Sequence, residues 1–407
     1  MKKIISVILT ISILCSLLFS IDTSASGDTI TVDSLTFTLY DTYCEVTKCD
    51  TKAVGDIIIP PSVEFDGTPL PVTSICGDAF YNCLKITSVT VPDGVTSICD
   101  RSFQFCNNLA SINLPDGLTK IGKYAFYGDI KLQDLNIPDS VTEIGERAFY
   151  NCSSITSITI PDGITSISDY MLGECKALTS VTIPDGVTTL GVCAFYYCNR
   201  IESINLPDTV TEIGCNAFQF CTSLKSVNLP EGITSINHDT FNGCAGLTGI
   251  KIPDSVTEIG RGAFYACSAL TEIIIPNKIT KISEIAFSGC RTLEKAYYIG
   301  EEEQWKENVA VGSNNDYLLN SLIYHPEHEY DDESDDLCNI CGYERKNTVV
   351  FKRGDCNGDG NVNNKDVVFL FKCVSGVAVG DESLLDFNGD GSVNNKDVVA
   401  LFKYVSA

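Results

Sequence analysis

One stretch of the chain reads Ile155-Thr-Ser-Ile-Thr-Ile-Pro161-Asp-Gly-Ile-Thr-Ser-Ile167, and variants of it return every 23 residues. The prolines of this pattern mark ten copies. They are Pro69, Pro92, Pro115, Pro138, Pro161, Pro184, Pro207, Pro230, Pro253 and Pro276. A fixed period this short is typical of a solenoid, in which each unit buries its apolar face against the next. The sequence therefore predicts a β-rich repeat solenoid of ten 23-residue turns over residues 69–293.

Each unit divides into short segments of different character. Before the proline, Ser157-Ile-Thr-Ile160 alternates polar and β-branched residues, as a half-buried strand does. The proline ends this strand because it has no amide to donate, and Pro-Asp-Gly is turn chemistry. A second short extended piece follows. Then come Phe, eleven residues after the proline, and Cys, fourteen residues after it, with only Leu172 and Asp129 departing from the pattern. We expect this last segment to form one helical or 3₁₀ turn.

The chain contains 20 cysteines, and nine of them occupy the same position of the repeat. Twenty cysteines in an exported chain would normally indicate disulfides. The periodic ones point the same way from one core position, so we interpret them as a ladder of buried free thiols. Disulfides between turns are the alternative.

The stretch Val141-Thr-Glu-Ile-Gly-Glu-Arg-Ala-Phe-Tyr-Asn-Cys152 resembles the consensus of bacterial leucine-rich repeats of the BspA-like type. This resemblance covers about two thirds of the chain. It implies a leucine-rich repeat rod. It says little about function, because such repeats present surfaces whose partners differ from protein to protein.

Both ends of the repeat array break the period. Residues 1–26 run from basic through apolar to small residues, which predicts a secretory signal peptide; a retained membrane anchor is the alternative. Residues 27–68 read as strands of an N-terminal β cap, which would cover the apolar end of the solenoid. Residues 294–324 resemble the C-terminal cap of the same family, and we expect Trp305 to be buried there. Nothing after the signal peptide is long and apolar enough to span a bilayer.

The composition limits the partners and the chemistry of the repeats. A net charge of −25, from 53 acidic and 28 basic residues, makes nucleic acid an unsuitable partner. The outward strand positions form uniform rows of Ser, Thr and Asn, and His238 is the only histidine of the array. An active site needs unlike groups with distinct roles, so we expect no catalytic residue in the repeats. A row of aromatic residues, among them Tyr127 and Tyr150, could stack on sugar rings or a partner protein, or pack between turns, which we favour.

Residues 325–350 are acidic and lack apolar periodicity, which is typical of a solvated linker. Within them, His325 and His328 are followed by Cys338 and Cys341. Two histidines and two cysteines are the ligand types of a tetrahedral zinc site. The segment is therefore either a linker with an incidental dithiol or a zinc knuckle.

Two calcium loops lie in residues 351–407. In each, oxygen side chains stand at loop positions one, three, five, nine and twelve, a backbone carbonyl is available at position seven, and glycine stands at position six, where the chain turns sharply. The oxygen-bearing residues are Asp355, Asn357, Asp359, Asn361, Asn363 and Asp366, and then Asp386, Asn388, Asp390, Ser392, Asn394 and Asp397. The two loops begin 31 residues apart. The sequence therefore predicts two bound calcium ions.

This duplicated segment resembles a type I dockerin, the calcium-binding module that joins secreted proteins to the cohesin domains of a cellulosome scaffold. The resemblance implies a small all-α domain. It also implies the residues that contact cohesin, which are Asn364, Lys365, Phe371, Lys372, Asn395, Lys396, Phe402 and Lys403. Many dockerins carry Ser-Thr where this chain has Asn-Lys, so the resemblance leaves the matching cohesin open.

Two interpretations of the whole chain follow. In the first, it is a secreted, non-catalytic cellulosome component, an interaction rod that binds an unknown protein or glycan and is anchored through its dockerin. In the second, it acts directly in plant polysaccharide degradation as a hydrolase or accessory protein, or it is a cell-surface adhesin. Against a hydrolase, no segment outside the repeats is large enough for a catalytic domain, and no pair of carboxylates stands apart from the repeat pattern.

Overall fold

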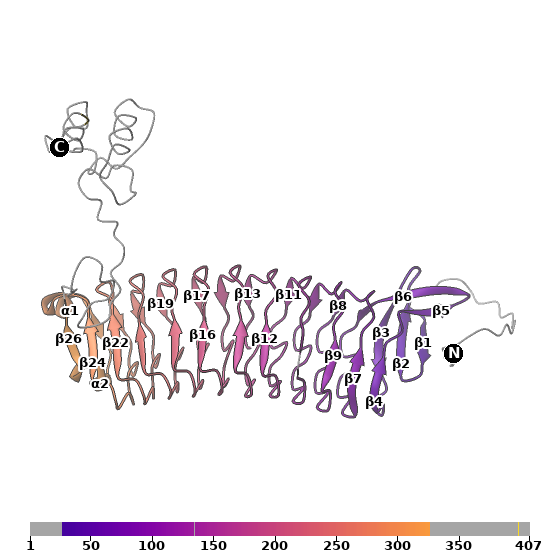
Figure 1. Ribbon diagram of the computed structural model, residues 1–407, viewed down its shortest axis with the longest axis horizontal. Helices are drawn as coiled ribbons and strands as arrows, with labels where there is room; N and C mark the ends of the chain where they lie inside the picture. Colours follow the sequence, from indigo (N-terminus) through magenta and orange to yellow (C-terminus); the bar gives the residue numbers. More distant parts are fainter. Residues whose placement is uncertain (1–26, 134, 326–397, 399–407) are drawn as a thin grey trace, which may run out of the picture. The chain divides into compact units, whose positions relative to one another are not determined.

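The computed structural model describes residues 27–133, 135–325 and 398. The chain divides into two units, residues 1–327 and 328–407. Residues 27–325, which we call the rod, form an elongated β-solenoid of stacked turns (Figure 1). This confirms the predicted fold class for the repeats. The all-α fold expected for the dockerin lies outside the described residues.

The rod begins with a small antiparallel sheet. Strands β1 (Thr29–Val32), β2 (Leu35–Leu39) and β3 (Cys44–Cys49) pair in order, and β3 then pairs in parallel with β6 (Thr68–Ile75). Strand β4 (Gly55–Ile58) lies within the range assigned to the cap from the sequence. It nevertheless pairs in parallel with β7 (Ile86–Thr90), so the repeat ladder starts before the first proline of the series.

Pro69 departs from the role expected of the periodic prolines. It lies inside β6, opposite Glu64 of β5 (Ser62–Phe65), in an antiparallel hairpin. The expectation that each proline ends a strand is therefore wrong here. Strand β5 pairs only with β6, and an edge hairpin tolerates proline because no further strand needs its amide.

Two ladders of parallel strands run along the rod. The first ladder continues from β7 through β9 (Ser111–Asn113), β12 (Ser157–Thr159), β14 (Ser180–Thr182), β16 (Ser203–Asn205), β18 (Ser226–Asn228), β20 (Gly249–Lys251) and β22 (Glu272–Ile275). The second contains β8 (Ser97–Ile98), β10 (Lys120–Ile121), β11 (Glu143–Ile144), β13 (Ser166–Ile167), β15 (Thr189–Leu190), β17 (Glu212–Ile213), β19 (Ser235–Ile236), β21 (Glu258–Ile259) and β23 (Lys281–Ile282). Paired strands align equivalent residues of successive units, as in Ser157↔Ser180. Each ladder is divided into shorter sheets, such as β12–β14 and β16–β18 in the first.

The third side of each turn is not an α-helix; of the two alternatives expected from the sequence, its i→i+3 hydrogen bonds fit a 3₁₀-type turn. It consists of hydrogen-bonded turns. Every second backbone amide donates to a carbonyl of the next unit, and the amides between them donate to the carbonyl three residues earlier in the same unit. The Phe103 amide donates to the carbonyl of Ala125 at 2.8 Å, whereas the Cys106 amide donates to that of Phe103 at 3.0 Å. Arg101 and Phe105 adopt positive φ angles of 59° and 64°. This alternation aligns half of the amides with the neighbouring turn, which a helix cannot do.

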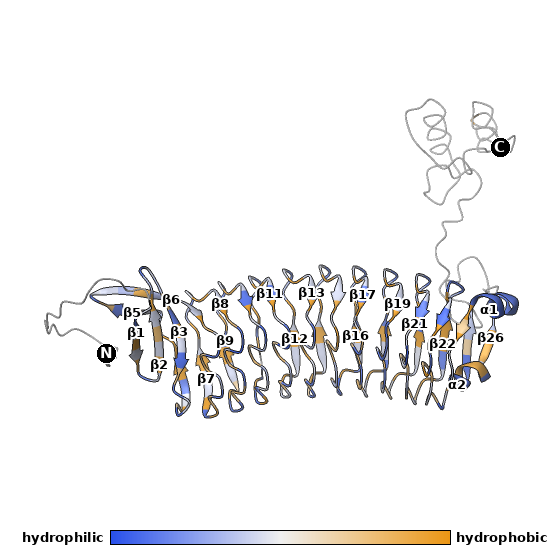
Figure 2. Ribbon diagram, turned by 180° about the vertical axis from the view of Figure 1, so that it is seen from behind, coloured by the Kyte–Doolittle hydropathy of each residue, from blue (hydrophilic) through white to orange (hydrophobic). Residues whose placement is uncertain are grey.

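The core is built from repeating columns of apolar side chains. Hydrophobic segments recur along the ribbon of successive turns (Figure 2). The periodic phenylalanines are fully buried, and neighbouring rings stack with centroids 4.7–5.6 Å apart. Leu172 fills the same position between Phe149 and Phe195 and is also fully buried. Ring stacking adds to the burial of apolar area, which is the main stabilising contribution.

The C-terminal end closes the stack with strands and two short helices. Strand β24 (Lys295–Tyr298) pairs with β22, and β26 (Leu322–Tyr324) pairs with β24, so the first ladder extends beyond the ten predicted turns. Strand β25 (Ala310–Val311) extends the second ladder, and α2 (Asp316–Asn320) precedes β26. In α1 (Glu302–Asn308), which is otherwise hydrophilic (Figure 2), Trp305 is buried with its ring 5.0 Å from that of Tyr298. The predicted burial of Trp305 is confirmed.

Candidate functional site

The predicted calcium ligands and cohesin contacts lie outside the described residues. The same holds for His328, Cys338 and Cys341 of the predicted zinc site. His325, the fourth predicted zinc ligand, directly follows β26. It is buried, its amide donates to the carbonyl of Tyr298 at 2.9 Å, and its ring lies 6.2 Å from that of Tyr297. Within residues 27–133 and 135–325, no cluster of three or more His, Cys, Asp or Glu side chains is placed to hold a metal ion.

The first strand ladder presents a flat face of small polar side chains. Ser157 and Thr159 of β12 are exposed while Ile158 between them is buried, and β9, β14, β16 and β18 have the same exposed outer positions. The ladder pairing places these side chains in straight rows along the rod. The face can donate and accept hydrogen bonds at regular intervals, and it brings no unlike reactive groups together.

The aromatic row packs between turns, as we favoured from the sequence. The rings of Tyr127 and Tyr150 stack at 5.1 Å with an interplanar angle of 10°. A Cβ atom added to Gly128 would lie 2.7 Å from the ring of Phe105, and one added to Gly243 would lie 2.4 Å from that of Phe220. Rings of one turn therefore cover the glycine backbone of the next. The stacked ring faces are therefore used for contacts within the rod, whereas Tyr81 and Tyr265 remain exposed.

Arg147 packs between two tyrosine rings of the neighbouring turns. Its guanidinium lies 4.1 Å from the centroid of the Tyr170 ring and 5.5 Å from that of Tyr124, and it donates to the Tyr124 hydroxyl at 2.7 Å. Glu146 forms an ion pair with it. Tyr124, Arg147 and Tyr170 belong to three successive turns, so Arg147 connects these turns. A cation held between two aromatic rings contributes to stability.

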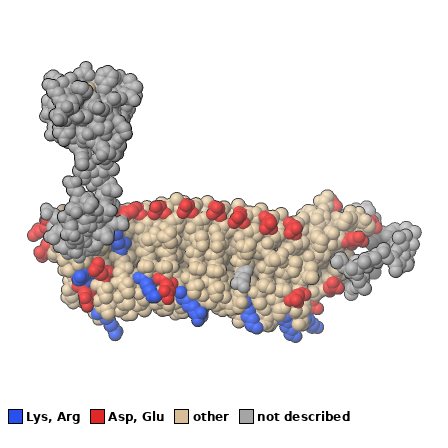
Figure 3. Space-filling view, viewed as in Figure 1, with Lys and Arg blue, Asp and Glu red and all other residues tan. Residues whose placement is uncertain are grey.

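The charged residues gather along the edges of the rod. Figure 3 shows a row of acidic residues along one long edge. An acidic residue follows eight of the ten periodic prolines, at Asp93, Asp116, Asp139, Asp162, Asp185, Asp208, Glu231 and Asp254. Several ion pairs cross between neighbouring turns, such as Lys225 with Glu202 at 2.8 Å. His238 is 54% exposed and lies 3.5 Å from Asp239, which confirms that it is a solvated edge residue.

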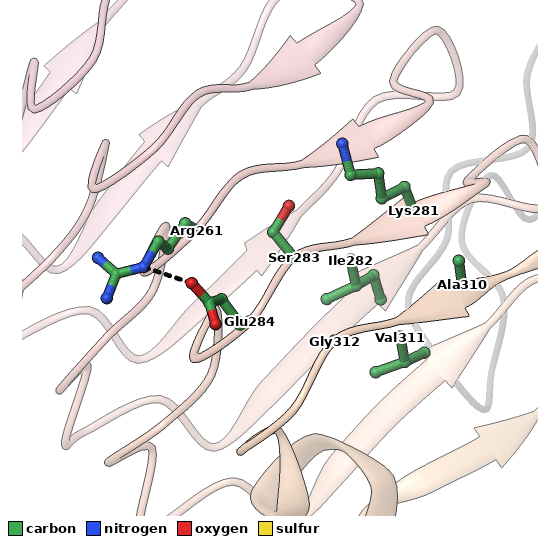
Figure 4. Close-up of a pocket in the computed structure, with 8 residues that line it drawn as sticks. All are labelled: Arg261, Lys281, Ile282, Ser283, Glu284, Ala310, Val311 and Gly312. Atoms are coloured by element: carbon green, nitrogen blue, oxygen red, sulfur yellow. Dashed lines mark hydrogen bonds and ion pairs between the residues drawn. The ribbon is translucent and has the colours of Figure 1, made fainter.

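A hollow of about 440 Å³ lies near the C-terminal end of the second ladder (Figure 4). Ile282, Ala310, Val311 and Gly312 contribute to its wall. At its rim Arg261 Nε donates to Glu284 Oε1 at 2.8 Å, and Lys281 pairs with Glu258 at 3.3 Å. Both cations are thus already paired. The hollow is shallow and open, and the charged groups beside it form ion pairs with each other or with the neighbouring turn.

The periodic cysteines form the ladder of buried free thiols predicted from the sequence. All 15 cysteines among the described residues are free. Eight of the nine periodic thiols donate to the carbonyl 26 residues earlier, with Sγ 3.0–3.2 Å from the oxygen. Burial raises the pKa of Cys175, Cys221 and Cys290 to about 12. These thiols are therefore protonated at neutral pH and act as hydrogen-bond donors within the core.

Comparison with known protein families gives two matches. The family described as BspA type leucine rich repeat region matches residues 73–201 and 192–314 in six copies. The type I dockerin domain matches residues 353–406. None of the curated proteins matches the chain.

Solved structures of bacterial leucine-rich repeat proteins resemble the rod. One from Bacteroides ovatus is 28% identical, with a TM-score of 0.60, and the match covers 74% of this chain and 79% of that one. A leucine-rich cell surface protein from Faecalibacterium prausnitzii is also 28% identical, with a TM-score of 0.41 and coverage of 69% and 97%. Across residues 27–133 and 135–325, the helices are too short and polar to cross a membrane.

Proposed function

Because this chain belongs to the BspA-type leucine-rich repeat family and carries a type I dockerin domain, we propose that it is a secreted, non-catalytic cellulosome component. Its dockerin binds a scaffold cohesin in a calcium-dependent manner, and its rod presents a surface to a protein or glycan. The observation that carries this proposal is the presence of both modules in one chain. A dockerin supplies attachment, and a solenoid supplies an extended binding surface.

The repeated side chains serve to hold the turns together, which supports a non-catalytic rod. The periodic Phe and Cys side chains are taken up by ring stacking and by thiol donation to the backbone. Threonines at a further position donate along the rod, as Thr119 Oγ1 does to the carbonyl of Thr96 at 3.0 Å. These side chains hold the turns together, as do Asn113 and Asn228 of the outer rows, whose amides bond to the backbone of Val91 and Leu206. The exposed Ser and Thr of the outer rows are left for recognition.

The two duplicated loops fit calcium by the chemistry of their side chains. Each supplies three carboxylates, Asp355, Asp359 and Asp366 in the first loop, together with neutral amide oxygens. Hard oxygen ligands of this kind suit calcium, and three carboxylates compensate its charge. We propose one ion in each loop and, as the family resemblance implies, cohesin contacts at Asn364, Lys365, Phe371 and Lys372 or at their duplicates.

The attachment is tested with the full chain and a panel of purified type I cohesins, by titration calorimetry with calcium and with a chelator. We expect saturable binding to at least one cohesin in calcium and none after chelation. Binding that persists in chelator, or calcium that fails to stabilise the chain, would contradict the proposal.

The role of the rod is tested on the cohesin-bound protein. We expect it to retain a soluble protein or an insoluble glycan and to release no sugar from that glycan. Sugar release that disappears when one carboxylate is replaced would favour the hydrolase interpretation instead.

The zinc knuckle remains a prediction, since only His325 of its four residues is described. If His325, His328, Cys338 and Cys341 hold zinc, the full chain binds one equivalent that calcium does not displace. The Cys338→Ser variant should lose that zinc. Metal analysis of the purified chain that finds no zinc would reduce residues 325–350 to a linker.

A further inference from the structure

Cys83 differs from the other thiols of the cysteine ladder. Its Sγ lies 4.0 Å from the nearest acceptor, the carbonyl oxygen of Cys49, whereas the other eight lie within 3.0–3.2 Å of theirs. The reason is its place in the fold. The residue 26 positions earlier is Ile57 of β4, and the neighbouring turn is instead supplied by the end of β3. Cys83 therefore lacks the close carbonyl partner of its equivalents.

Cys49 lies next to Cys83, whose sulfur is 4.0 Å from the Cys49 carbonyl oxygen. Cys49 is the last residue of β3, and its amide donates to the carbonyl of Ala79 at 2.6 Å, which holds the two backbone segments together. Both cysteines are buried, and the Cys83 sulfur contacts the backbone of a second cysteine. The Cys49 thiol lies 3.7 Å from the carbonyl oxygen of Asp50, a longer contact than the 3.0–3.2 Å of the other ladder thiols, so neither sulfur is held by a close acceptor.

The electrostatics of this pair favour exchange chemistry. The neighbouring Cys49 thiol lowers the pKa of Cys83, and the neighbouring Cys83 thiol together with burial raises the pKa of Cys49. In the other ladder positions, such as Cys175, burial raises the pKa. A dithiol in which one partner stabilises the thiolate of the other is the arrangement that promotes attack on a disulfide.

We propose that Cys49 and Cys83 form a disulfide that fastens the N-terminal cap to the first turn of the solenoid. The oxidant is a low-molecular-weight disulfide. The Cys83 thiolate attacks one of its sulfurs and releases the first small thiolate. Cys49 then loses its proton and attacks the Cys83 sulfur of the mixed disulfide, releasing the second. The two protein thiols lose two hydrogens in total, and the oxidant becomes two small thiols.

Two other cysteine pairs between neighbouring turns, outside the ladder, are poorer candidates. Cys76 and Cys99 follow residues in parallel register, Ile75 and Ile98. However, the Cys76 thiol donates to Glu45 Oε2 at 3.1 Å, and burial together with this carboxylate raises its pKa to about 12. At the second pair, burial raises the pKa of Cys193 and of Cys215. Neither pair holds a stabilised thiolate.

The test refolds the full chain in a mixture of glutathione and glutathione disulfide, so that the buried thiols can react before the cap closes. Remaining thiols are then blocked with N-ethylmaleimide, and the protein is digested for mass spectrometry. We expect the peptides containing Cys49 and Cys83 to be linked in most molecules, and the link to disappear on reduction. The Cys83→Ser variant should lose the link and leave Cys49 blocked by the maleimide. The control Cys221→Ser, at an equivalent ladder position in the middle of the rod, should retain it.

The proposal fails if Cys49 and Cys83 are both recovered as maleimide adducts, or if Cys49 is linked to a different cysteine. The wild-type peptide map decides this even if Cys83→Ser does not fold. As a second measurement, cleavage by a protease within residues 27–54 reports unfolding of the cap. Oxidation should raise the denaturant midpoint of this unfolding. Equal proteolysis of the oxidised and reduced chains would also overturn the proposal.

Discussion

The backbone amide of Cys106 donates to Oδ1 of Asp129 at 2.7 Å, in the middle of a column of thiols. Asp129 occupies the ladder position that nine other units fill with cysteine, and it is fully buried. Its other oxygen, Oδ2, has no hydrogen-bond partner. The equivalent thiols donate to the backbone carbonyl 26 residues earlier, which here is Phe103. A protonated Oδ2 can make the same donation, so Asp129 replaces a thiol as a neutral acid.

This predicts that the rod loses stability as the pH rises. Burial raises the pKa of Asp129 well above its ordinary value, and the neighbouring thiols of Cys106 and Cys152 are neutral because burial raises their pKa as well. The unfolded chain ionises the same carboxyl near pH 4. Above that pH the folded state binds more protons than the unfolded state, so the contribution of Asp129 is complete below about pH 4 and is lost as the pH increases.

The Asp129→Asn variant should therefore be more stable than the wild type at pH 7, by about 1–3 kcal/mol. The advantage should disappear near pH 4, where the wild-type carboxyl is protonated in both states. Fluorescence of the single tryptophan, Trp305, during denaturant unfolding measures it. The exposed turn residue Asp139 is the control, and Asp139→Asn should change stability by less than about 0.5 kcal/mol. An advantage of Asp129→Asn that is the same at both pH values would contradict this assignment.

Ile285 should be a site where a single substitution stabilises the rod. Its φ is 53°, a left-handed conformation that a β-branched residue adopts only with strain. Asp239 and Asn216 occupy the equivalent position two and three units earlier, with φ angles of 55° and 60°. Asparagine tolerates this conformation, so Ile285→Asn should raise the free energy of unfolding by about 1 kcal/mol. The reciprocal Asn216→Ile should lower it. Denaturant midpoints that fail to move in opposite directions would refute the strain argument.

The phenylalanine column should tolerate leucine better than alanine. Phe218 is fully buried between Phe195 and Phe241, with centroids at 5.4 and 5.5 Å. Phe218→Ala should cost about 3–5 kcal/mol because it removes these contacts and leaves a cavity. Phe218→Leu should cost much less, since Leu172 already fills this position in another turn. Equal losses for the two variants, measured by urea unfolding, would mean that Leu172 is accommodated by a local change that Phe218 cannot copy.

The duplication in the dockerin predicts two binding modes. Residues 355–375 and 386–406 differ at only four places, so half a turn would exchange the two copies. Replacing Asn364 and Lys365 by Ala should weaken cohesin binding about twofold, because losing one of two equal modes costs RT ln 2, about 0.4 kcal/mol. The pair Asn395 and Lys396 should behave alike, and all four changes should abolish binding. If one pair alone removes binding in calorimetry, the interface has a single mode.

Much of the rod could be predicted because its sequence is periodic. The spacing of the prolines gave the two ladders, and the position of Trp305 outside the pattern gave its burial in the cap. The segment around Phe103 was expected to form one helical or 3₁₀ turn. It makes i→i+3 hydrogen bonds, but every second amide bonds to the next turn, a tertiary preference that a single unit does not reveal.

The remaining features depend on breaks in the period. Pro69 has the spacing of a turn proline, yet the β5–β6 hairpin inserted before it places it inside a strand. The contact of Cys49 with Cys83 joins residues 34 apart, a spacing that occurs nowhere in the repeat and so carries no signal in the sequence. Asp129 was visible only as an exception, and its protonation follows from burial. The calcium and cohesin residues, in contrast, rest on a local motif that needs no tertiary information.

The hydrogen bonds between turns also determine how the rod responds to mechanical force. They run from one unit to the next, as from Phe103 to Ala125, and so lie along the length of the stack. A pull on one end of the chain therefore loads the bonds of the outermost turn before any others. Each turn that detaches frees 23 residues, about 75–80 Å of extended chain. Under tension from whatever it holds, the rod would lengthen one turn at a time and shorten again as turns reattach.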